Sequence, residues 1–435
     1  GTTLSRRPWQ EFVPATWLHA VPMYIAMGFA VLAKGPIGVL LPCTIIGLFL
    51  LIRQQLDYRL DQPSAAARVW WQSWILNALQ TLNPLRVLRG SLAMRVPMGA
   101  FIVAAIALPW YVAVGIQTDG EWLAGFLGGH NVGRFLQPME NHRGPFVYYI
   151  PVVLMGTMPW SVLLPLAIWR ASQRLSVRGT GHASDLFLLA WAGAWIGFFS
   201  LAKTKLPNYV LPCYPALALL VGSYLTQWRR EAATVGGISF RHACRIQAAV
   251  SAVILVGIPF AAVYFLPDEW WLAAVAICPL VGAGIAYGYV CQHRRLRAVR
   301  ALAISAVALA VMVVGICPAW VARHQDGLTF GRFIQSLPSS ADAPLATYEY
   351  FAPNLVFYAE RHVHRLKKPQ IAEFFANHPD GLLLTRDDRL DQLDAELPTD
   401  ITVLTKQRRF LRQHDLVLLG RNVQTVQPAS HTTLR

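Results

Sequence analysis

Long apolar runs, separated by short stretches of glycine, proline and charged residues, fill this 435-residue chain up to about Val321. Most of the runs approach or exceed the roughly 20 residues that a helix needs to cross the hydrocarbon core of a bilayer. The pattern therefore predicts nine membrane-spanning helices, at residues 13–33, 37–52, 97–116, 147–169, 184–201, 206–226, 246–266, 270–290 and 300–321. The second run is short for a span, as expected of a tilted or partly re-entrant helix.

Beyond Val321 the pattern changes to short apolar runs of strand length set among charged residues. Runs at residues 346–350, 381–385, 401–404 and 416–419 predict strands, with helical stretches between them. The fold class that follows is a mostly α membrane protein with a small α/β domain. We expect a helical transmembrane domain at residues 1–321, the α/β domain at 322–423, and a disordered polar tail at 424–435.

Composition supports a membrane protein, because 55% of the residues are hydrophobic and only 14% are charged. The formal net charge of +15 suggests nucleic acid at first, but its distribution along the chain excludes that partner. When the connections are taken alternately, one side of the membrane holds nineteen basic residues and the other five. By the positive-inside rule the first side is cytoplasmic. The five residues (Lys34, Arg134, Arg143, Lys203 and Lys205) and the C-terminal domain are then extracytoplasmic, and the expected location is a bacterial inner membrane.

The segment LAKTKLPNYVLPCYP at residues 201–215 places Lys203 and Lys205 in a tight connection between two predicted spans. Ammonium groups at the ends of spans often extend to the headgroup layer without binding a ligand. Paired lysines at such a turn are also suited to hold a phosphate at the membrane surface. The spacing of these two residues leaves both readings open.

Other predicted outward segments bring further cations to the same side of the membrane. Lys34 lies in an Ala-Lys-Gly-Pro turn, and Arg134 lies in the long loop that also contains His130 and His142. Arginine can hold phosphate oxygens bidentately, whereas lysine acts as a point charge. We therefore predict a phosphate or pyrophosphate site formed by Lys34, Arg134, Lys203 and Lys205.

The remaining site candidates are His130, His142, Tyr148 and Tyr149, which are expected to support the site. No motif indicates a cofactor. A divalent cation is compatible with the two histidines, although two histidines twelve residues apart in a loop are not a metal-binding signature.

Five motifs occur in an order that resembles a known family: AKGPIG around Lys34, HNVGRFLQP around Arg134, HRGPFVYYIP from His142, Pro159-Trp160, and AKTKLPNYVLPCYPALALL from Ala202. This order is similar to that in membrane glycosyltransferases of the dolichyl-phosphate-mannose protein mannosyltransferase type, the GT-C class. The closest group resembles the bacterial 4-amino-4-deoxy-L-arabinose transferases that modify lipid A. The resemblance covers residues 13–226 by motif and the rest by layout.

The resemblance implies an enzyme that takes a sugar from a polyprenyl-phosphate donor and transfers it to an extracytoplasmic acceptor. The sugar is expected to be aminoarabinose or a hexose, and the acceptor lipid A, another glycolipid or a protein hydroxyl. Carried over from the family, Lys34 and Arg134 lie near the lipid phosphate, with Lys203 and Lys205 as neighbours. Cations there would stabilise the charge that develops on the leaving phosphate.

The sequence departs from the family pattern in one respect. The family carries an acidic residue, expected to be the general base, in a loop after its first span, and no such loop precedes Arg6. The chain is therefore expected to be a fragment or a degenerate homologue, with its catalytic carboxylate unknown. Asp119 and Glu140 are on the predicted outer side, but no motif match marks either as a replacement.

Two alternatives remain open at this point. A transporter or flippase for an anionic lipid would also need cationic groups, but transporters usually place them near the bilayer midplane and show internal repeats, which this sequence lacks. A non-catalytic glycosyltransferase homologue would bind the donor without transferring its sugar. An additional span and an acidic outward loop encoded upstream of Gly1 would favour the enzyme.

Overall fold

The computed structural model describes residues 8–61, 83–138, 143–175, 182–230, 237–265, 270–322, 326–336, 343–393, 396–407, 409 and 414–421. It divides into two compact units. The first comprises Gly1–Gln247 with Ala283–Ala303, and the second comprises Ala248–Gly282 with Ile304–Arg435. The domain boundary at residue 321 stays a prediction, and the predicted tail at 424–435 lies outside the described residues.

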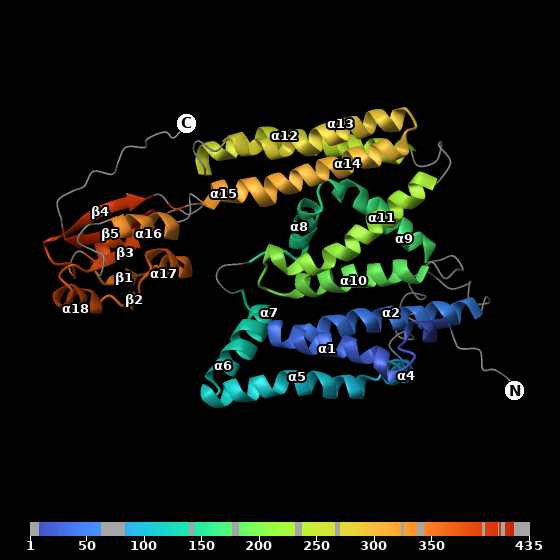
Figure 1. Ribbon diagram of the computed structural model, residues 1–435, viewed down its shortest axis with the longest axis horizontal. Coiled ribbons are helices and arrows are strands. Elements are labelled where there is room, and N and C mark those ends of the chain that lie inside the picture. Colours follow the sequence, from blue (N-terminus) through green and yellow to red (C-terminus); the bar gives the residue numbers. More distant parts are fainter. Residues whose placement is uncertain are drawn as a thin grey trace. The chain divides into compact units, whose positions relative to one another are not determined.

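Helices make up the chain as far as Val321 (Figure 1). The α-helices are α1 (Trp17–Lys34), α2 (Ile37–Asp61), α4 (Pro84–Ala93), α5 (Val96–Gln117), α6 (Glu121–Leu123), α7 (Arg134–Leu136), α8 (Tyr149–Gly156), α9 (Leu164–Arg174), α10 (His182–Leu201), α11 (Tyr214–Arg230), α12 (Gly237–Phe265), α13 (Ile277–Cys291), α14 (Arg295–Ala310) and α15 (Cys317–Val321). Two π-helices, η3 (Ala124–Gly133) and η8 (Val311–Ile316), and five 3₁₀ segments (Pro8–Phe12, Phe146–Tyr148, Trp160–Leu163, Pro207–Cys213 and Trp270–Ala276) join or extend them.

The described residues include eight helices that are long and apolar enough to cross a membrane, or nine if one broken pair counts as a single span. All nine predicted spans overlap these helices. The prediction of one continuous helix at 147–169 is wrong, because Phe146–Gly156 and Trp160–Arg174 meet at an angle of 117°. Pro159 lies at the break and has no N–H with which to continue a helical ladder. The short second run belongs to the 25-residue helix α2.

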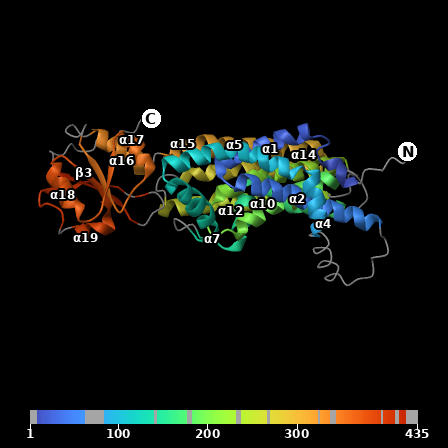
Figure 2. The same ribbon diagram turned by 90° about the horizontal axis from the view of Figure 1, so that it is seen from below.

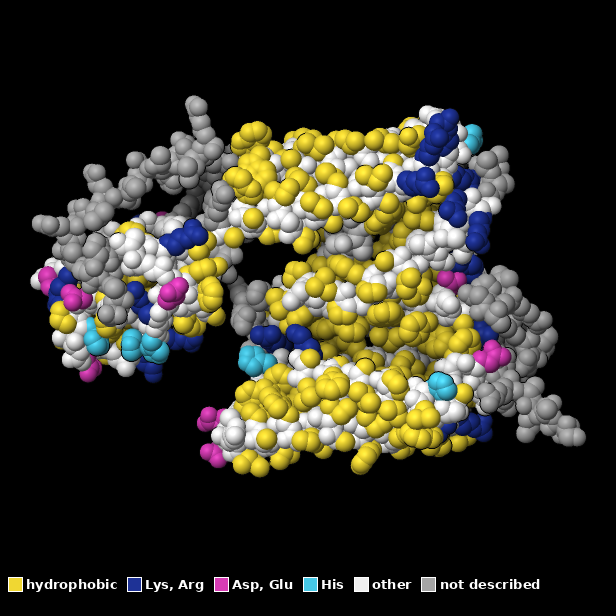
Figure 3. All heavy atoms as spheres, viewed as in Figure 1, with side chains coloured by type: hydrophobic (Ala, Val, Ile, Leu, Met, Phe, Trp, Pro, Cys, Tyr) yellow, Lys and Arg dark blue, Asp and Glu magenta, His cyan; other side chains and the backbone are white. Residues whose placement is uncertain are grey.

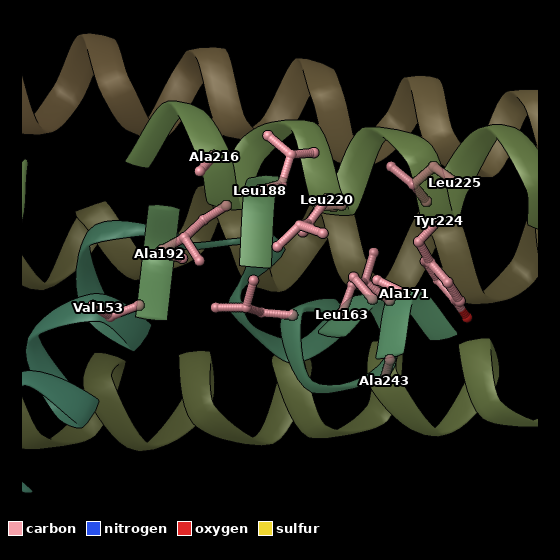
Figure 4. Packing of buried hydrophobic residues seen from close by; sticks show 14 of the residues in the cluster. Val153, Leu163, Ala171, Leu188, Ala192, Ala216, Leu220, Tyr224, Leu225 and Ala243 are labelled. Atoms are coloured by element: carbon pink, nitrogen blue, oxygen red, sulfur yellow. The ribbon is translucent and has the colours of Figure 1, made fainter. Parts of the chain in front are cut away.

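The largest hydrophobic core of the first unit is centred on α8 to α11, with further residues from α2, α12, α13 and α14 (Figure 4). Trp228, Tyr149 and Phe240 are its largest fully buried side chains. Leu188 and Ala192 of α10 face Leu220 and Ala216 of α11 across this core. Helices α1, α2 and α5 pack beside one another around a smaller cluster centred on Tyr24. The packing holds α10, α11 and their connection in a fixed position.

The surface of the helical part shows the arrangement expected of a membrane protein. In Figure 3, hydrophobic side chains cover the lengths of the helices, and lysine and arginine side chains gather at helix ends. Large apolar side chains such as Phe101, Val256 and Val314 are more than 70% exposed, as expected for residues that face lipid.

The second unit contains a five-stranded sheet of order β2-β1-β3-β5-β4. The sheet and the helices that follow Val321 are α16 (Asp326–Ser336), β1 (Leu345–Tyr348), α17 (Pro353–Ala359), β2 (Val363–Leu366), α18 (Gln370–Asn377), β3 (Leu382–Arg386), a 3₁₀ turn (Asp387–Arg389), α19 (Leu390–Leu393), β4 (Ile401–Gln407) and β5 (Leu416–Arg421). Strand β1 is parallel to β2 and β3, whereas β5 is antiparallel to β3 and β4. Helices α16 and α17 cover one face of the sheet, and α18 and α19 cover the other (Figure 2).

The predicted α/β character and the four predicted strands of this region are confirmed, but strand β2 was not predicted. Its sequence, Val363-His364-Arg365-Leu366, carries two polar residues between two apolar ones. Among the described strands β2 pairs with β1 alone and lies at the sheet edge, so its side chains are largely exposed and it needs no apolar run.

Candidate functional site

Lys34 is the last residue of α1, and the turn that follows it is packed against the loop that carries Arg134. Gly35 caps the helix with φ +73° and ψ −156°, and its N–H donates to the carbonyl of Val31 (2.7 Å). A Cβ on Gly35 would lie 3.1 Å from the Phe126 ring and 3.2 Å from the Asn131 amide. The Lys34–Gly35 turn and the π-helix η3 are therefore in direct contact.

The π-helix η3 leads without interruption into α7, which begins at Arg134. Its sequence, AGFLGGHNVG, is rich in glycine, and the Asn131 side chain donates to the Phe126 carbonyl (2.7 Å) within it. The Phe126 ring stacks on Trp122 with a centroid distance of 4.6 Å. π-helices are rare and frequently occur at functional sites. Here the segment fixes Arg134 three residues after the contact with Gly35.

The backbone at Arg134 is joined to the lysine turn by hydrogen bonds. The N–H of Lys203 donates to the Phe135 carbonyl (2.9 Å), and the N–H of Thr204 donates to the Arg134 carbonyl (3.1 Å). The buried Thr204 hydroxyl also donates to the carbonyl of Gln137 (3.0 Å). These three bonds connect segments almost 70 residues apart in the sequence and set the position of Lys203 relative to Arg134.

The side chains at this junction differ in exposure. Lys34 and Lys203 are exposed, and Arg134 is half-buried. Two lysines and an arginine held on adjoining backbone segments create a positive potential that suits a polyanion. The predicted phosphate-binding role of these residues stays a prediction, but the structure brings their three segments together.

Lys205 differs from the other cations because its ammonium is inside the protein. The residue is only 4% exposed, and Nζ donates to the carbonyls of Phe199 (3.0 Å) and Ser200 (2.6 Å) in the last turn of α10. Burial, together with the nearby charge of Lys203, lowers the pKa of Lys205 below its ordinary value. Its role toward a phosphate also stays a prediction, while its contacts show that it caps the C-terminus of α10.

Tyr149 and Gly144 hold Lys205 from the side of the HRGP motif. The Lys205 ammonium lies 5.5 Å from the centre of the Tyr149 ring, and Tyr148 packs edge-on against Tyr149 (5.1 Å). A Cβ on Gly144 would lie 3.0 Å from Cγ of Lys205 and 3.0 Å from the Tyr148 ring. Of the two tyrosines predicted as site support, Tyr149 therefore contacts Lys205 directly, and Tyr148 packs against Tyr149 and Gly144 beside it.

The other predicted residues are not brought into this junction by any described contact. His130 is exposed on η3, and Asp119 is exposed in the turn between α5 and α6. His142 and Glu140 lie outside the described residues, so their predictions stay open. In the described part of the chain, one group of three metal-ligating side chains (Asp387, Asp388 and His414) is close enough to share an ion, and it belongs to the second unit.

A groove of about 610 Å³ runs along α1, α2 and α5 beside the Lys34 turn. Val31, Pro36, Tyr111 and Leu127 line it near the turn, and it continues to Tyr24 further along α1. Nearly all of its lining residues are apolar. The cationic junction therefore adjoins a volume suited to a hydrocarbon chain.

Asn131 and Gly144 were not predicted as parts of the site. Both are in motifs that were recognised, but an asparagine within a glycine-rich loop and a glycine before proline carry no chemical signal of their own. A positive-φ glycine packed against an amide, and a glycine against a lysine stem, are visible only when the segments are brought together.

Gly35→Ala is expected to lower the free energy of unfolding by about 1–3 kcal/mol, because φ +73° with ψ −156° is a conformation that nearly only glycine adopts. The new methyl would also press on Asn131. Thermal unfolding in detergent measures this. Gly128→Ala is the control, since its φ is not positive and a Cβ there meets open space. Equal midpoints for the two variants would contradict the strain at Gly35.

Comparisons with known proteins agree with the motifs. No protein-family model matches the chain. A stretch of 128 residues is 38% identical to an undecaprenyl phosphate-alpha-4-amino-4-deoxy-L-arabinose arabinosyl transferase of Erwinia tasmaniensis, covering 29% of this chain and 22% of that protein. A stretch of 195 residues is 33% identical to arabinosyl transferase 2 of the same description from Proteus mirabilis, covering 43% and 34%. The matched stretches thus span about a fifth to a third of these relatives.

The fold is similar to that of ArnT from Cupriavidus metallidurans. Its crystal structure bound to undecaprenyl phosphate matches with a TM-score of 0.58 and 21% identity, over 92% of this chain and 68% of that one. The apo structure matches over the same shares with a TM-score of 0.59. The resemblance drawn from the motifs is therefore confirmed: stretches of this membrane protein are similar to undecaprenyl-phosphate aminoarabinose transferases, and its fold is similar to that of ArnT.

Proposed function

We propose that this chain forms the donor-binding part of a membrane glycosyltransferase that moves a sugar from polyprenyl phosphate to an extracytoplasmic glycolipid. The observation that carries the proposal is the backbone pairing of Lys203 and Thr204 with Phe135 and Arg134. It joins two motifs whose cations suit a phosphate, and Gly35 brings the Lys34 turn against the same loop. Its relatives' names favour aminoarabinose as the sugar and undecaprenyl phosphate as the carrier.

The chemistry assigns different tasks to the cations. Arg134 would hold two oxygens of the donor phosphate, while Lys34 and Lys203 would act as exposed point charges. In the reaction, the bond between the sugar C1 and the phosphate oxygen breaks, and C1 bonds to the acceptor oxygen. The electron pair of the broken bond stays on the phosphate, where the cations stabilise it. The acceptor proton passes to a general base, and we assign this role to none of the described residues.

The apolar groove beside Lys34 would take the isoprene units nearest the phosphate. Its lining from Pro36 and Tyr111 to Tyr24 follows the direction of α1, along which a lipid tail would lie. A volume of about 610 Å³ is within the range of specific ligand pockets. By the positive-inside rule we expect this end of α1 on the extracytoplasmic side. The acceptor, for which we propose lipid A, is expected on the same side.

Binding of undecaprenyl phosphate, compared with undecaprenol, tests the donor site on the purified protein in detergent. We expect the phosphate to tighten binding, and Lys203→Ala to weaken binding of undecaprenyl phosphate about tenfold, the effect of one charge-assisted hydrogen bond of about 1.5 kcal/mol. Undecaprenol binding should not change. Arg229→Ala, an exposed arginine in the last turn of α11, is the matched control.

Equal affinity for the two lipids would contradict the proposed phosphate site. In proteoliposomes, movement of the donor across the bilayer without transfer of its sugar would instead support a flippase. Donor binding without transfer or movement by the complete gene product would support a non-catalytic homologue.

A further inference from the structure

Three histidines meet at the edge of the sheet in the second unit, in a place that the proposed transfer does not use. His364 lies in the edge strand β2, and His362 directly precedes that strand. His378 directly follows the end of α18. Figure 3 shows histidine side chains gathered on the surface of this region. His362 and His364 are exposed, and His378 is half-buried.

The topology explains why they meet. Residues two apart on an extended chain share a face, so His362 and His364 point to the same side of β2. Helix α18 covers that side and returns the chain to the amino ends of the parallel strands before β3. There the N–H of His378 donates to the carbonyl of Phe374 (2.9 Å), and its carbonyl accepts from the N–H of Gly381 (2.9 Å). Both backbones are therefore held in regular structure.

The rings are close to one another. The centroid distance is 4.6 Å between His362 and His364, and 6.5 Å between His364 and His378. The rings of His364 and His378 both contact Phe374, at 6.3 and 5.1 Å. Within the described part of the chain, ring contacts are the side-chain interactions recorded for these three residues, and their nitrogens have no hydrogen-bond or ion-pair partner.

Strand alternation keeps the neighbouring arginines away from the histidines. The Arg365 guanidinium lies 3.3 Å from the centre of the Phe351 ring, and Phe351 packs with the cluster on the opposite face of the sheet. Arg361 donates to the carbonyls of Ala343 (2.9 Å) and Ala359 (3.2 Å). The guanidinium groups of Arg361 and Arg365 thus bind other partners and do not face the imidazoles. This favours a cation over an anion as the ligand of the three histidines.

We propose that His362, His364 and His378 bind a divalent transition-metal ion of the zinc type. Neutral imidazole nitrogens are preferred ligands of Zn²⁺, Ni²⁺ and Cu²⁺, with Zn–N distances of about 2.0–2.1 Å. As they are placed, the three rings do not bring their nitrogens within 4.8 Å of one another, so binding requires the exposed rings of His362 and His364 to rotate about their side-chain torsions toward His378. Water completes the coordination. Such a metal links β2 to the end of α18 at an otherwise open sheet edge.

The group of Asp387, Asp388 and His414 is the competing site in the same unit. Its carboxylates are already paired, Asp387 with Lys406 (3.0 Å) and Asp388 with Arg386 (2.7 Å). A metal there would have to compete with the positive charges of Lys406 and Arg386. The three histidines have no such competition, and His414 therefore serves as the control residue.

Zinc binding to the full chain, purified in detergent without a polyhistidine tag and stripped with a chelator, tests the proposal. Titration with ZnCl₂ should show one ion per chain, and His364→Ala and His378→Ala should each weaken binding at least tenfold, whereas His414→Ala should not. Unchanged circular dichroism verifies that the variants are folded, as exposed positions lead one to expect. No stoichiometric binding by the wild-type chain, binding that survives the triple His362/His364/His378→Ala variant, or binding lost only in His414→Ala would overturn it.

Discussion

Replacing Lys34 and Arg134 together by alanine is expected to slow sugar transfer from a polyprenyl-phosphate donor about 10²–10³-fold. The negative charge on the donor phosphate grows as its bond to the sugar breaks, so cations fixed beside it stabilise the transition state more than the ground state. Arg134 is suited to this task because its position is set by the bonds of its backbone and of Phe135 to the lysine turn. Lys34 is held nearby through Gly35 and Asn131.

Transfer is measured in membranes that contain the complete gene product, with a lipid-linked sugar as donor. Arg134→Lys is expected to recover only part of the activity, since an ammonium keeps the charge but not the bidentate geometry. The double variant Arg229→Ala/Arg230→Ala removes two charges from the last turn of α11 and should transfer normally. Normal transfer by the Lys34/Arg134 variant would show that the cationic junction is not the donor phosphate site.

Apolar periodicity was sufficient to predict the spans because each helix that faces lipid must be apolar along its length. It could not show the 117° break between Phe146–Gly156 and Trp160–Arg174, since both halves are apolar and only Pro159 marks the junction. Strand β2 was not predicted for the opposite reason. An edge strand is exposed on much of its surface, so Val363-His364-Arg365-Leu366 has no apolar run to recognise.

The candidate site could be predicted in its chemistry but not in its geometry. Charge and topology indicated five cations on one side of the membrane, and the family resemblance pointed to four of them: Lys34, Arg134, Lys203 and Lys205. The pairing of Lys203 and Thr204 with Phe135 and Arg134 is made by backbone atoms, which every residue type carries, so no sequence pattern encodes it. For the same reason the sequence could not distinguish Lys203, which is exposed, from Lys205, which is buried.

Because Lys205 is buried, its contribution to the stability of the protein depends on pH. Its pKa is lowered in the folded protein, so between that value and the ordinary 10.5 the unfolded chain binds more protons than the folded one. Stability contributed by this group therefore rises as the pH increases through that window. Below it, the buried charge is a cost that the two carbonyls and the Tyr149 ring offset only in part, which is why the pKa is lowered.

Lys205→Met is expected to lower the free energy of unfolding by about 2–4 kcal/mol, because it leaves the carbonyls of Phe199 and Ser200 without the charge-assisted bonds that cap α10. Methionine keeps the apolar stem that Gly144 contacts, so the loss isolates the ammonium. Lys203→Met is the matched control: its side chain is exposed, and its backbone bond to Phe135 does not need the ammonium. We expect unchanged thermal unfolding in detergent for that variant, together with weakened binding of undecaprenyl phosphate. If Lys205→Met instead unfolded like the wild type while losing donor binding, Lys205 would be a phosphate ligand and its contacts with α10 would be incidental.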